Sequence, residues 1–402
     1  MLPLFYVISH YFNLPFRAWE QRKLGDIANY RNGKAHEQVE DEDGKYTIIN
    51  SKFISTNGKV QRYTNEQVEP IFDGEIAMVL SDLPNGKALA KLFLVKEDGK
   101  YTLNQRIAGI TPNENIDPIF LNFRMNRNNY FLKFDSGVTQ TNLSKSQVEN
   151  FIALYPTFDE QYKIGLFFTQ LDDTIALHQR KLDALKLMKK AFSQQIFPEN
   201  NRKKPKIRFT SFYEEWEQRK IGEYGYFYYG KSAPKWSVAQ DATTPCVRYG
   251  ELYTKFGPEI DIVHSYTNID KSNLKFSSGN EVLVPRVGEN PLDFANCSWL
   301  SISNVAIGEM ISVYNTEQYP LFIAYYFRSK MKYEFAKRVE GGNVSNLYYS
   351  YLEDILISVP SIEEQKKIAE FLNKIDITIN LLQNKLGRIK ELKKAYLQNM
   401  FI

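Results

Sequence analysis

Residues 158–197 read FDEQYKIGLFFTQLDDTIALHQRKLDALKLMKKAFSQQIF, and residues 362–401 read IEEQKKIAEFLNKIDITINLLQNKLGRIKELKKAYLQNMF. Counting from Glu160 against Glu364, 18 of 38 successive positions are identical without a gap. Internal repeats of this length determine the domain organisation of a chain. The 402-residue chain therefore carries a long segment twice, at an offset of 204 positions.

Apolar residues recur in both segments at alternating spacings of four and three. This is the heptad pattern of a coiled coil. Each segment follows a proline, Pro156 or Pro360, and has acidic residues in its first turn, which suits a helix start. At about 1.5 Å per residue, each segment predicts a helix of about 57 Å, and the two can pair antiparallel. The predicted seam consists of Ile164, Phe168, Leu171, Ile175, Leu182, Leu185, Ile368, Leu372, Ile375, Ile379, Leu386 and Ile389.

Shorter motifs repeat in the same order. WEQRKLG at 19–25 matches WEQRKIG at 216–222 in six of seven letters, and a Gly-Lys pair follows each copy. The turn GVTQTN at 137–142 corresponds to GGNVSN at 341–346. Between these matched ends, the middles of the two halves show no alignment. Matched ends with unlike centres indicate one scaffold that is used twice to meet two different targets.

The middles contain short runs of β-branched and aromatic residues bounded by glycine, such as KYTIINSKFI and EVLVPRV, which predict strands. We therefore predict an α+β fold with two sheet-rich domains, separated by two long antiparallel coiled-coil helices in an internal pseudo-twofold repeat. The expected boundaries are 1–157 for the first domain (with an atypical apolar lead-in at 1–15), 158–197 for the first helix, 198–361 for a linker and the second domain, and 362–402 for the second helix.

Composition excludes several function classes. Cys246 and Cys297 are far apart and the chain has four histidines in no zinc-like spacing, so no metal site is expected. The sequence contains neither the phosphate-binding pattern G-x-x-x-x-G-K-[ST] nor the pattern G-x-G-x-x-G after a strand. Asn290-Pro291-Leu292-Asp293 is interpreted as a turn. We expect no catalytic residues. The apolar start is too short to span a bilayer and is a poor signal peptide, so no membrane association and a cytoplasmic location are expected.

Basic residues lie among aromatics and amides in both middles, although the net charge is only +4. Arginine and lysine bind phosphates, and arginine, asparagine and glutamine read base edges. The two polar turns are candidates for a groove, with ordinary turns as the alternative. The predicted DNA-binding residues are Arg31, Lys34, Arg106, Thr139, Gln140, Thr141, Lys231, Arg248, Arg286, Asn343 and Ser345.

The duplicated series of Trp-Glu-Gln-Arg-Lys, Gly-Lys, sheet-rich middle, Gly-containing turn, proline, Glu-Gln-x-x-Ile and long helix resembles the specificity subunit of type I restriction–modification systems. The resemblance covers about residues 16 to 402. It implies two target-recognition domains that each read one half of a bipartite asymmetric site in double-stranded DNA. It also implies helices that set the spacer and dock the modification (methyltransferase) subunits, of which two are expected, together with restriction/translocase subunits. S-adenosylmethionine, ATP and Mg²⁺ are then expected on those partners, with no cofactor in this chain.

The sequence departs from a perfect repeat in two places. A basic lead-in, KPKIRFTSFYEE, precedes Trp216, whereas an apolar stretch precedes Trp19. Gln140 corresponds to Val344, so base contacts cannot be copied between the halves. Two other interpretations stay open: the specificity chain of a bifunctional type II system, and a coiled-coil adaptor whose domains bind protein.

Overall fold

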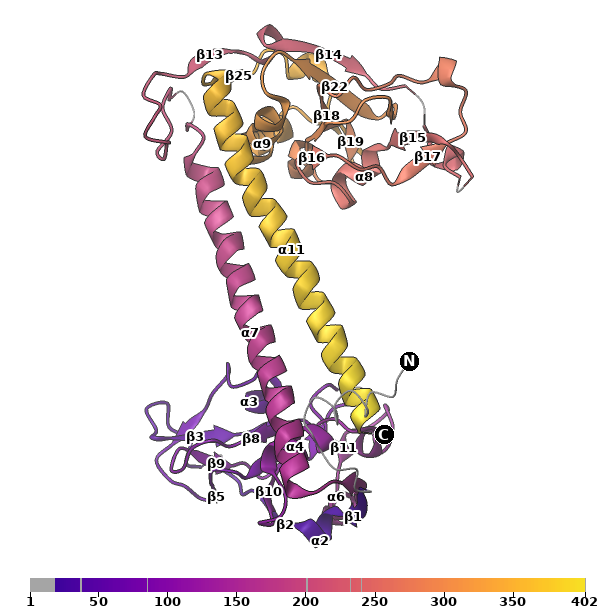
Figure 1. Cartoon of the computed structure of the whole chain (residues 1–402). Helices are drawn as coiled ribbons and strands as arrows, with labels where there is room; N and C mark the ends of the chain where they lie inside the picture. Colours follow the sequence, from indigo (N-terminus) through magenta and orange to yellow (C-terminus); the bar gives the residue numbers. More distant parts are fainter. Residues whose placement is uncertain are drawn as a thin grey trace. The chain divides into compact units, whose positions relative to one another are not determined.

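The computed structural model describes residues 19–36, 38–84, 86–199, 202–231, 233–239 and 241–401; the predicted apolar lead-in at 1–15 lies outside them. The chain divides into two compact units. Unit 1 comprises Met1–Gln179 and Lys385–Ile402, and unit 2 comprises Arg180–Asn384. Each unit contains antiparallel-rich sheets and part of both long helices (Figure 1). The predicted α+β class with its repeated architecture is confirmed.

The two long helices are α7 (Phe158–Gln195) and α11 (Ile362–Met400). The predicted end of the first helix is two residues too long. Pro198 disfavours helical geometry in the residue before it, and Ile196 and Phe197 leave the helix to enter the core of unit 2. Phe401, the matching residue after α11, packs against the core of unit 1. Each long helix therefore ends in the core of the unit that it enters last.

The helices run antiparallel within each unit. In unit 1, Phe167 lies 5.3 Å from Tyr396 and Phe168 lies 5.7 Å from Phe401, measured between ring centroids. In unit 2, Phe192 lies 5.0 Å from Phe371. The structure places all twelve predicted seam residues at buried or half-buried positions, as heptad packing requires.

Two ion pairs related by the repeat cross the helix seam. Lys189 Nζ lies 2.5 Å from Asp376 Oδ1 in unit 2, and Lys393 Nζ lies 2.5 Å from Asp172 Oδ1 in unit 1. The lysines and the aspartates are each separated by the same offset of 204 positions. A slip of the helices by one heptad would separate both pairs, so together they favour a single antiparallel register.

Unit 1 contains two four-stranded sheets. The first has the order β2-β10-β6-β8, all antiparallel, with bounds Ala28–Asn32, Ile107–Pro112, Ile76–Val79 and Leu92–Leu94. The second has the order β4-β3-β9-β5, with bounds Tyr63–Thr64, Tyr46–Ile49, Tyr101–Leu103 and Pro70–Ile71. The described helices besides α7 and α11 are α2 (Leu24–Ile27), α3 (Ser51–Ser55), α4 (Pro118–Met125), α5 (Asn129–Leu132) and α6 (Lys145–Glu149).

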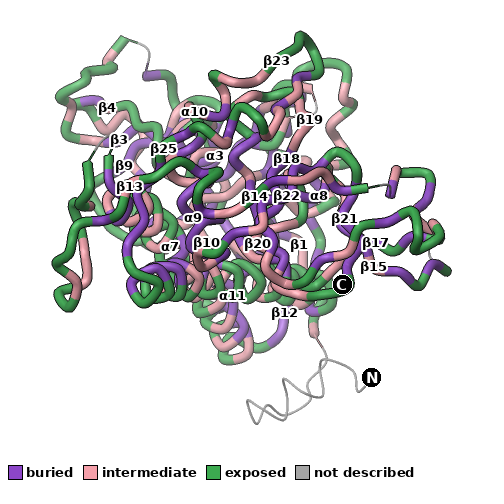
Figure 2. The backbone as a smooth tube through the Cα atoms, turned by 90° about the horizontal axis from the view of Figure 1, so that it is seen from above, coloured by how far each residue is buried: buried purple, intermediate pink, exposed green. Residues whose placement is uncertain are grey.

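Unit 2 repeats this topology where the sequences do not align. Its main sheet has the order β14-β22-β18-β20-β16, with bounds Gly225–Tyr229, Ile311–Thr316, Glu281–Pro285, Ser298–Leu300 and Glu259–Ile260. A second sheet, β17-β15-β21, spans Ser265–Thr267, Thr244–Val247 and Ala306–Ile307. Every residue of β18 is buried, which places the core on both faces of this strand (Figure 2). The helices are α8 (Tyr249–Thr254), α9 (Pro320–Lys330) and α10 (Lys332–Ala336), with 3-10 turns η1 (Ile221–Glu223), η2 (Lys235–Ser237), η3 (Lys271–Asn273), η4 (Pro291–Ala295) and η5 (Tyr349–Tyr351).

The repeated sequence motifs are structural partners of one another. The EQRK of the first motif forms β1 (Glu20–Lys23), which pairs antiparallel with β12 (Ile152–Tyr155) just before the proline that precedes α7. In unit 2, β13 (Glu217–Lys220) pairs with β25 (Leu356–Val359) in the same register. The EQRK motif and the strand before the proline therefore recur together, because each supplies one strand of the same two-stranded sheet.

A buried glutamine near the start of each long helix ties that helix to its unit. Gln161 Oε1 accepts a hydrogen bond from the Asp117 N–H at 3.1 Å, and its Nε2 donates to the Pro156 carbonyl at 2.9 Å. Gln365 does the same with the Tyr319 N–H at 2.9 Å and the Pro360 carbonyl at 2.8 Å. Asp117 and Tyr319 directly precede α4 and α9. Each glutamine amide therefore pairs both a backbone N–H at the start of a short helix and the carbonyl of the proline before the long helix.

An arginine holds the two sheets of unit 1 together. Arg31 on β2 makes two 2.6 Å contacts with the Glu75 carboxylate, and its Nε donates to Glu69 at 3.1 Å. Only 7% of the Glu75 side chain is exposed. Burial alone would raise the pKa of Glu75, but hydrogen bonds from Arg31, Thr111 and the Phe72 N–H outweigh it and hold that pKa below its usual value.

We expect Gln365→Ala to lower the free energy of unfolding by about 2–4 kcal/mol, because it leaves a buried N–H and a buried carbonyl without partners. Chemical denaturation would measure the loss. Gln398→Ala, at an exposed position of α11, is the matched control and should change stability by less than about 0.5 kcal/mol. Equal effects of the two substitutions would contradict the role of Gln365.

Arg31→Met should destabilise the protein by about 3 kcal/mol at pH 7, because the Glu75 carboxylate stays buried without its cation. Since the folded pKa of Glu75 is depressed in the parent protein, its contribution is present above the unfolded value and lost as pH falls through the folded pKa. In the variant the pH dependence of this contribution reverses, because the buried carboxylate has lost its cation. Acidification to about pH 4.5 should protonate Glu75 and recover part of the lost stability.

Denaturant midpoints measured from pH 4 to pH 8 test this reversal. Arg62→Met removes an exposed ion pair with Glu40 and serves as the control, with a change under about 0.5 kcal/mol at every pH. A loss in Arg31→Met that does not depend on pH would refute the account of Glu75.

Candidate nucleic-acid interface

The predicted polar turn of unit 2 is the tip of a hairpin. Strands β23 (Glu340–Gly341) and β24 (Ser345–Asn346) pair with each other, and β24 also pairs with β19 (Val287–Gly288). Gly341 has a φ of +113°, which glycine adopts without strain. Asn343 and Val344 are exposed at the tip, whereas Ser345 is buried and its hydroxyl donates to the Gly342 carbonyl at 3.3 Å. Of the predicted pair, Asn343 faces solvent and Ser345 shapes the turn.

The matching turn of unit 1 is held differently. Strand β11 (Thr141–Asn142) pairs with β7 (Ser81–Asp82), as β24 pairs with β19. Gln140 is exposed and its Nε2 donates to Ser81 Oγ at 2.6 Å, while Thr139 is exposed at the tip. Thr141 is buried, and its hydroxyl donates to Asp135 at 3.1 Å. Thr139 and Gln140 are therefore accessible to a ligand, and Thr141 supports them.

The repeated Gly-Lys pair occupies equivalent positions in the two units. The Lys34 N–H donates to the Leu103 carbonyl at 3.0 Å, and the Lys231 N–H donates to the Ile307 carbonyl at 2.9 Å. A Cβ atom on Gly33 or Gly230 would collide with a backbone carbonyl, so only glycine fits before each lysine. The side chains differ: Lys34 pairs with Glu69 at 3.0 Å, and Lys231 Nζ donates to the Ser272 carbonyl at 3.4 Å.

Arg286 has the strongest binding geometry among the predicted residues. Its guanidinium lies 4.3 Å from the Tyr229 ring centroid and 5.4 Å from that of Tyr348. Within the described part of the chain, this guanidinium makes no ion pair or hydrogen bond, and its Nε is buried without a partner. Stacking therefore fixes the orientation of the side chain, while its Nη donors remain open to a phosphate or a base.

Further aromatic and basic groups lie along β14, with Tyr226 and Tyr228 on the opposite face of the strand from Tyr229. Lys275 Nζ lies 5.1 Å from the Tyr228 ring centroid and donates to the Tyr229 carbonyl at 2.8 Å, and 61% of Tyr226 is exposed. We call this group the aromatic–basic cluster; it comprises Tyr226, Tyr228, Tyr229, Lys231, Lys275, Arg286 and Tyr348. The predicted DNA-binding residues include Lys231 and Arg286 but none of the other members of this cluster. The tyrosine-rich run GYFYYGK at residues 225–231 was the available signal.

The remaining predicted residues do not join this cluster. Arg31 is occupied by the internal network with Glu69 and Glu75. Arg106 is exposed in the turn between β9 and β10 of unit 1. Arg248 is half-buried beside a pocket of about 120 Å³ that Lys235 and Glu309 also line.

The described residues contain no group of three histidine, cysteine, aspartate or glutamate side chains that could hold a metal ion. In the same part of the chain, no helix is both long enough and apolar enough to cross a membrane. Burial raises the pKa of the Cys246 thiol to about 11, so this cysteine stays a neutral thiol near neutral pH.

Comparison with solved structures finds the same architecture. The S subunit of the type I restriction–modification system of M. genitalium matches with a TM-score of 0.61 at 12% identity, covering 97% of this chain and 98% of the other. A structure described as showing complex assembly and conformational transition of the type I restriction–modification system matches with a TM-score of 0.51 at 16% identity, covering 96% and 98%. At these identities the likeness shows the fold.

Sequence relatives carry the comparison further. Two proteins of Methanocaldococcus jannaschii are each 25% identical over 94% of this chain: the putative type I restriction enzyme MjaX specificity subunit, covered to 91%, and the type I restriction enzyme MjaVIII specificity subunit, covered to 90%. The model of the type I restriction modification DNA specificity domain matches residues 17–187 and again 213–391. Because two copies of that model span most of the chain, one for each duplicated half, the protein belongs to the type I restriction–modification DNA specificity family.

Proposed function

We propose that this chain is the DNA-recognition subunit of a type I restriction–modification complex, in which each unit reads one half of a bipartite asymmetric site. The observation that carries the proposal is the repeated topology with unlike surfaces. Unit 2 presents Arg286 stacked on Tyr229 and Tyr348, together with the tyrosines and lysines along β14, whereas unit 1 presents Lys34, Arg106, Thr139 and Gln140. Different side chains on one scaffold imply different half-sites.

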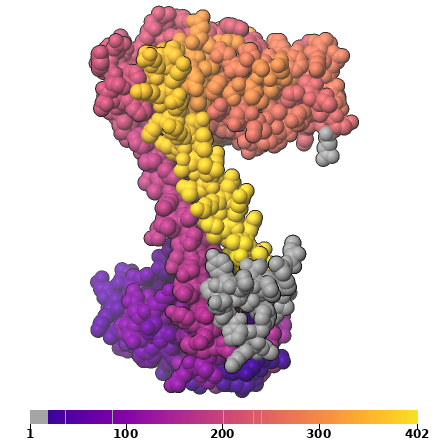
Figure 3. Space-filling model, viewed as in Figure 1, coloured from indigo at the N-terminus to yellow at the C-terminus, as the bar shows by residue number. Residues whose placement is uncertain are grey.

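The long helices are proposed to set the spacer and to dock the modification subunits. Opposite the seam, α7 carries exposed apolar residues that fall within an arc of about 120° at 100° per residue. Exposed apolar residues of α11 fall in the same arc. Figure 3 shows one side of α11, in yellow, at the surface. These residues are Phe158, Tyr162, Leu166, Leu177, Leu187, Met188, Ile362, Ile377, Leu381 and Leu392.

An exposed apolar stripe on the outer face of a paired helix is typical of a protein-binding surface. Because the stripe is repeated on both helices, with Phe158, Leu177 and Met188 matching Ile362, Leu381 and Leu392, two copies of one partner would fit it. We propose two modification subunits as that partner, with restriction subunits added to the assembly. Adenine methylation, S-adenosylmethionine, ATP and Mg²⁺ would belong to those subunits in the cytoplasm, and this chain would select the site without catalysis.

Arg286→Ala should weaken binding of the assembled complex to its DNA by about tenfold or more, and should reduce the slope of log affinity against log salt by about one. Titration of a labelled duplex at several salt concentrations measures both quantities. Arg219→Ala, which removes an exposed arginine on β13, is the matched control. A protein-binding adaptor would show no counterion slope on DNA, and that result would contradict the proposal.

Seven residues inserted between Arg180 and Lys181, and seven between Asn384 and Lys385, keep the heptad phase and add about 10 Å to each helix. We expect the gap in the methylated motif to grow by about three base pairs while both half-sites stay the same. Mapping of methylated adenines would measure the gap. An unchanged gap in an assembled, active complex would refute the spacer role of the helices.

A further inference from the structure

We propose that Glu289 in unit 2 is a specificity-determining residue that accepts a hydrogen bond from the exocyclic amino group of a base, cytosine N4 or adenine N6, in the half-site of that unit. This inference rests on the proposed function, because it names the chemistry that the second target-recognition domain reads. Glu289 follows β19, the strand that pairs with the polar hairpin, and none of the predicted DNA-binding residues is acidic.

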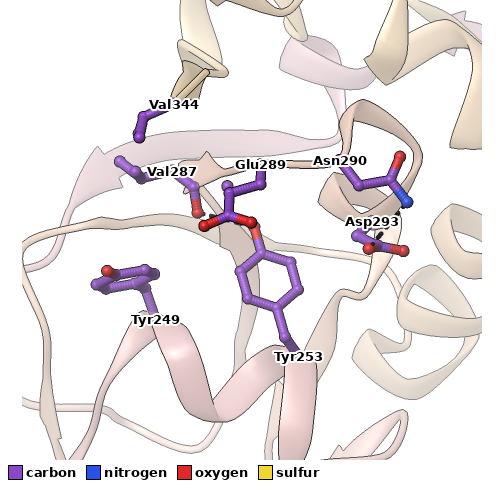
Figure 4. A pocket seen from close by; sticks show the side chains of 8 residues that line it. Tyr249, Tyr253, Val287, Glu289, Asn290, Asp293 and Val344 are labelled. Atoms are coloured by element: carbon purple, nitrogen blue, oxygen red, sulfur yellow. Dashed lines mark hydrogen bonds between the residues drawn. The ribbon is translucent and has the colours of Figure 1, made fainter.

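Glu289 lies in a pocket of about 350 Å³ with aromatic and apolar walls. In Figure 4 the rings of Tyr249 and Tyr253 rise from α8 toward Val287 and Glu289, and Val344 enters from the hairpin tip. The lining residues are Tyr249, Tyr253, Val287, Gly288, Glu289, Asn290, Asp293 and Val344. The pocket therefore joins the hairpin tip, which carries the predicted DNA contact Asn343, to the residues after β19.

The pocket walls are held by internal hydrogen bonds. Tyr253 Oη donates to the Val287 carbonyl at 2.9 Å, which ties α8 to β19. A Cβ atom on Gly288 would lie 2.8 Å from the same Tyr253 oxygen, so the close approach favours glycine there. Asn290 caps η4 by accepting from the Leu292 N–H at 3.2 Å, as the predicted turn at this tetrapeptide requires.

The carboxylate of Glu289 differs from its neighbours in having no partner within the described part of the chain. Asp293 accepts a hydrogen bond from Asn290 Nδ2 at 3.1 Å. The buried carboxylates of unit 2 are also satisfied, since Glu251 accepts from Ser265 at 2.6 Å and Glu364 pairs with Arg208 at 2.7 Å. Glu289 is exposed and makes neither kind of contact. Its oxygens thus remain available as acceptors beside the hairpin.

Charge decides which part of DNA this acceptor could meet. A carboxylate repels phosphate oxygens and the carbonyl oxygens of guanine and thymine, and it accepts from the amino groups of cytosine and adenine. The stacked Arg286 lies three residues earlier and offers the opposite chemistry, with donors that suit guanine O6 and N7 or a phosphate. With an acceptor and a donor on one short segment, unit 2 can read a base amino group through Glu289 and guanine or a phosphate through Arg286.

The test is Glu289→Gln in the complete complex with the modification subunit, read by mapping adenine methylation across a genome. Glutamine keeps the size of the side chain but can also donate, so it tolerates the carbonyl groups that a carboxylate rejects. We expect one position of a single half-site, restricted to cytosine or adenine in the parent protein, to lose about tenfold or more of its discrimination. The other half-site and the gap should not change.

Glu317→Gln, an exposed carboxylate of unit 2 outside the pocket, is the matched control and should leave the motif unchanged. If Glu289→Gln and the control both retain the parent motif, the proposed contact is wrong while the proposed function stands. If the parent complex itself yields no bipartite motif, the proposed function fails, and the proposal for Glu289 fails with it. Broadening in both half-sites would also overturn the proposal, because it would mean a general loss of structure.

Discussion

The antiparallel register of α7 and α11 is the constraint on which the rest of the structure depends. Lys189 with Asp376 and Lys393 with Asp172 favour it through two ion pairs that the internal repeat makes equivalent, beside the buried seam. The helix ends then deliver Phe197 to the core of unit 2 and residues such as Met400 to the core of unit 1. Neither unit closes its core without a piece of both helices, so helix pairing and domain folding are coupled.

The helices and the repeated motifs were accessible from the sequence because they follow local rules. Heptad spacing fixes which face of a helix is apolar, and all twelve seam residues are buried or half-buried. The sheet order of the middles was not accessible, because many unrelated sequences satisfy the same alternation of buried and exposed positions. Arg31 illustrates the limit for single residues: its partners Glu69 and Glu75 lie about 40 positions away, and no local signal distinguishes it from Arg286.

The two units combine a shared frame with different surfaces, and this division explains why matched residues make different contacts in the two units. The frame includes the strand pairs beside each proline, the glutamines at the helix starts and the glycines before Lys34 and Lys231. The surfaces differ at each tip, since Gln140 bonds to Ser81 whereas Val344 lines the pocket with Glu289. A frame that is indifferent to surface side chains allows each half-site to change without disturbing the spacer.

The most direct test of the account is the methylation pattern of the complex formed by this chain and its modification subunit, expressed in a host without adenine methylation. The account predicts one motif with two different halves and a gap of fixed length, because two unlike units are joined by one pair of helices. An unsplit motif, or two halves joined by a variable gap, would contradict it. The first result would show that only one unit reads DNA, and the second that the helices do not set the spacing.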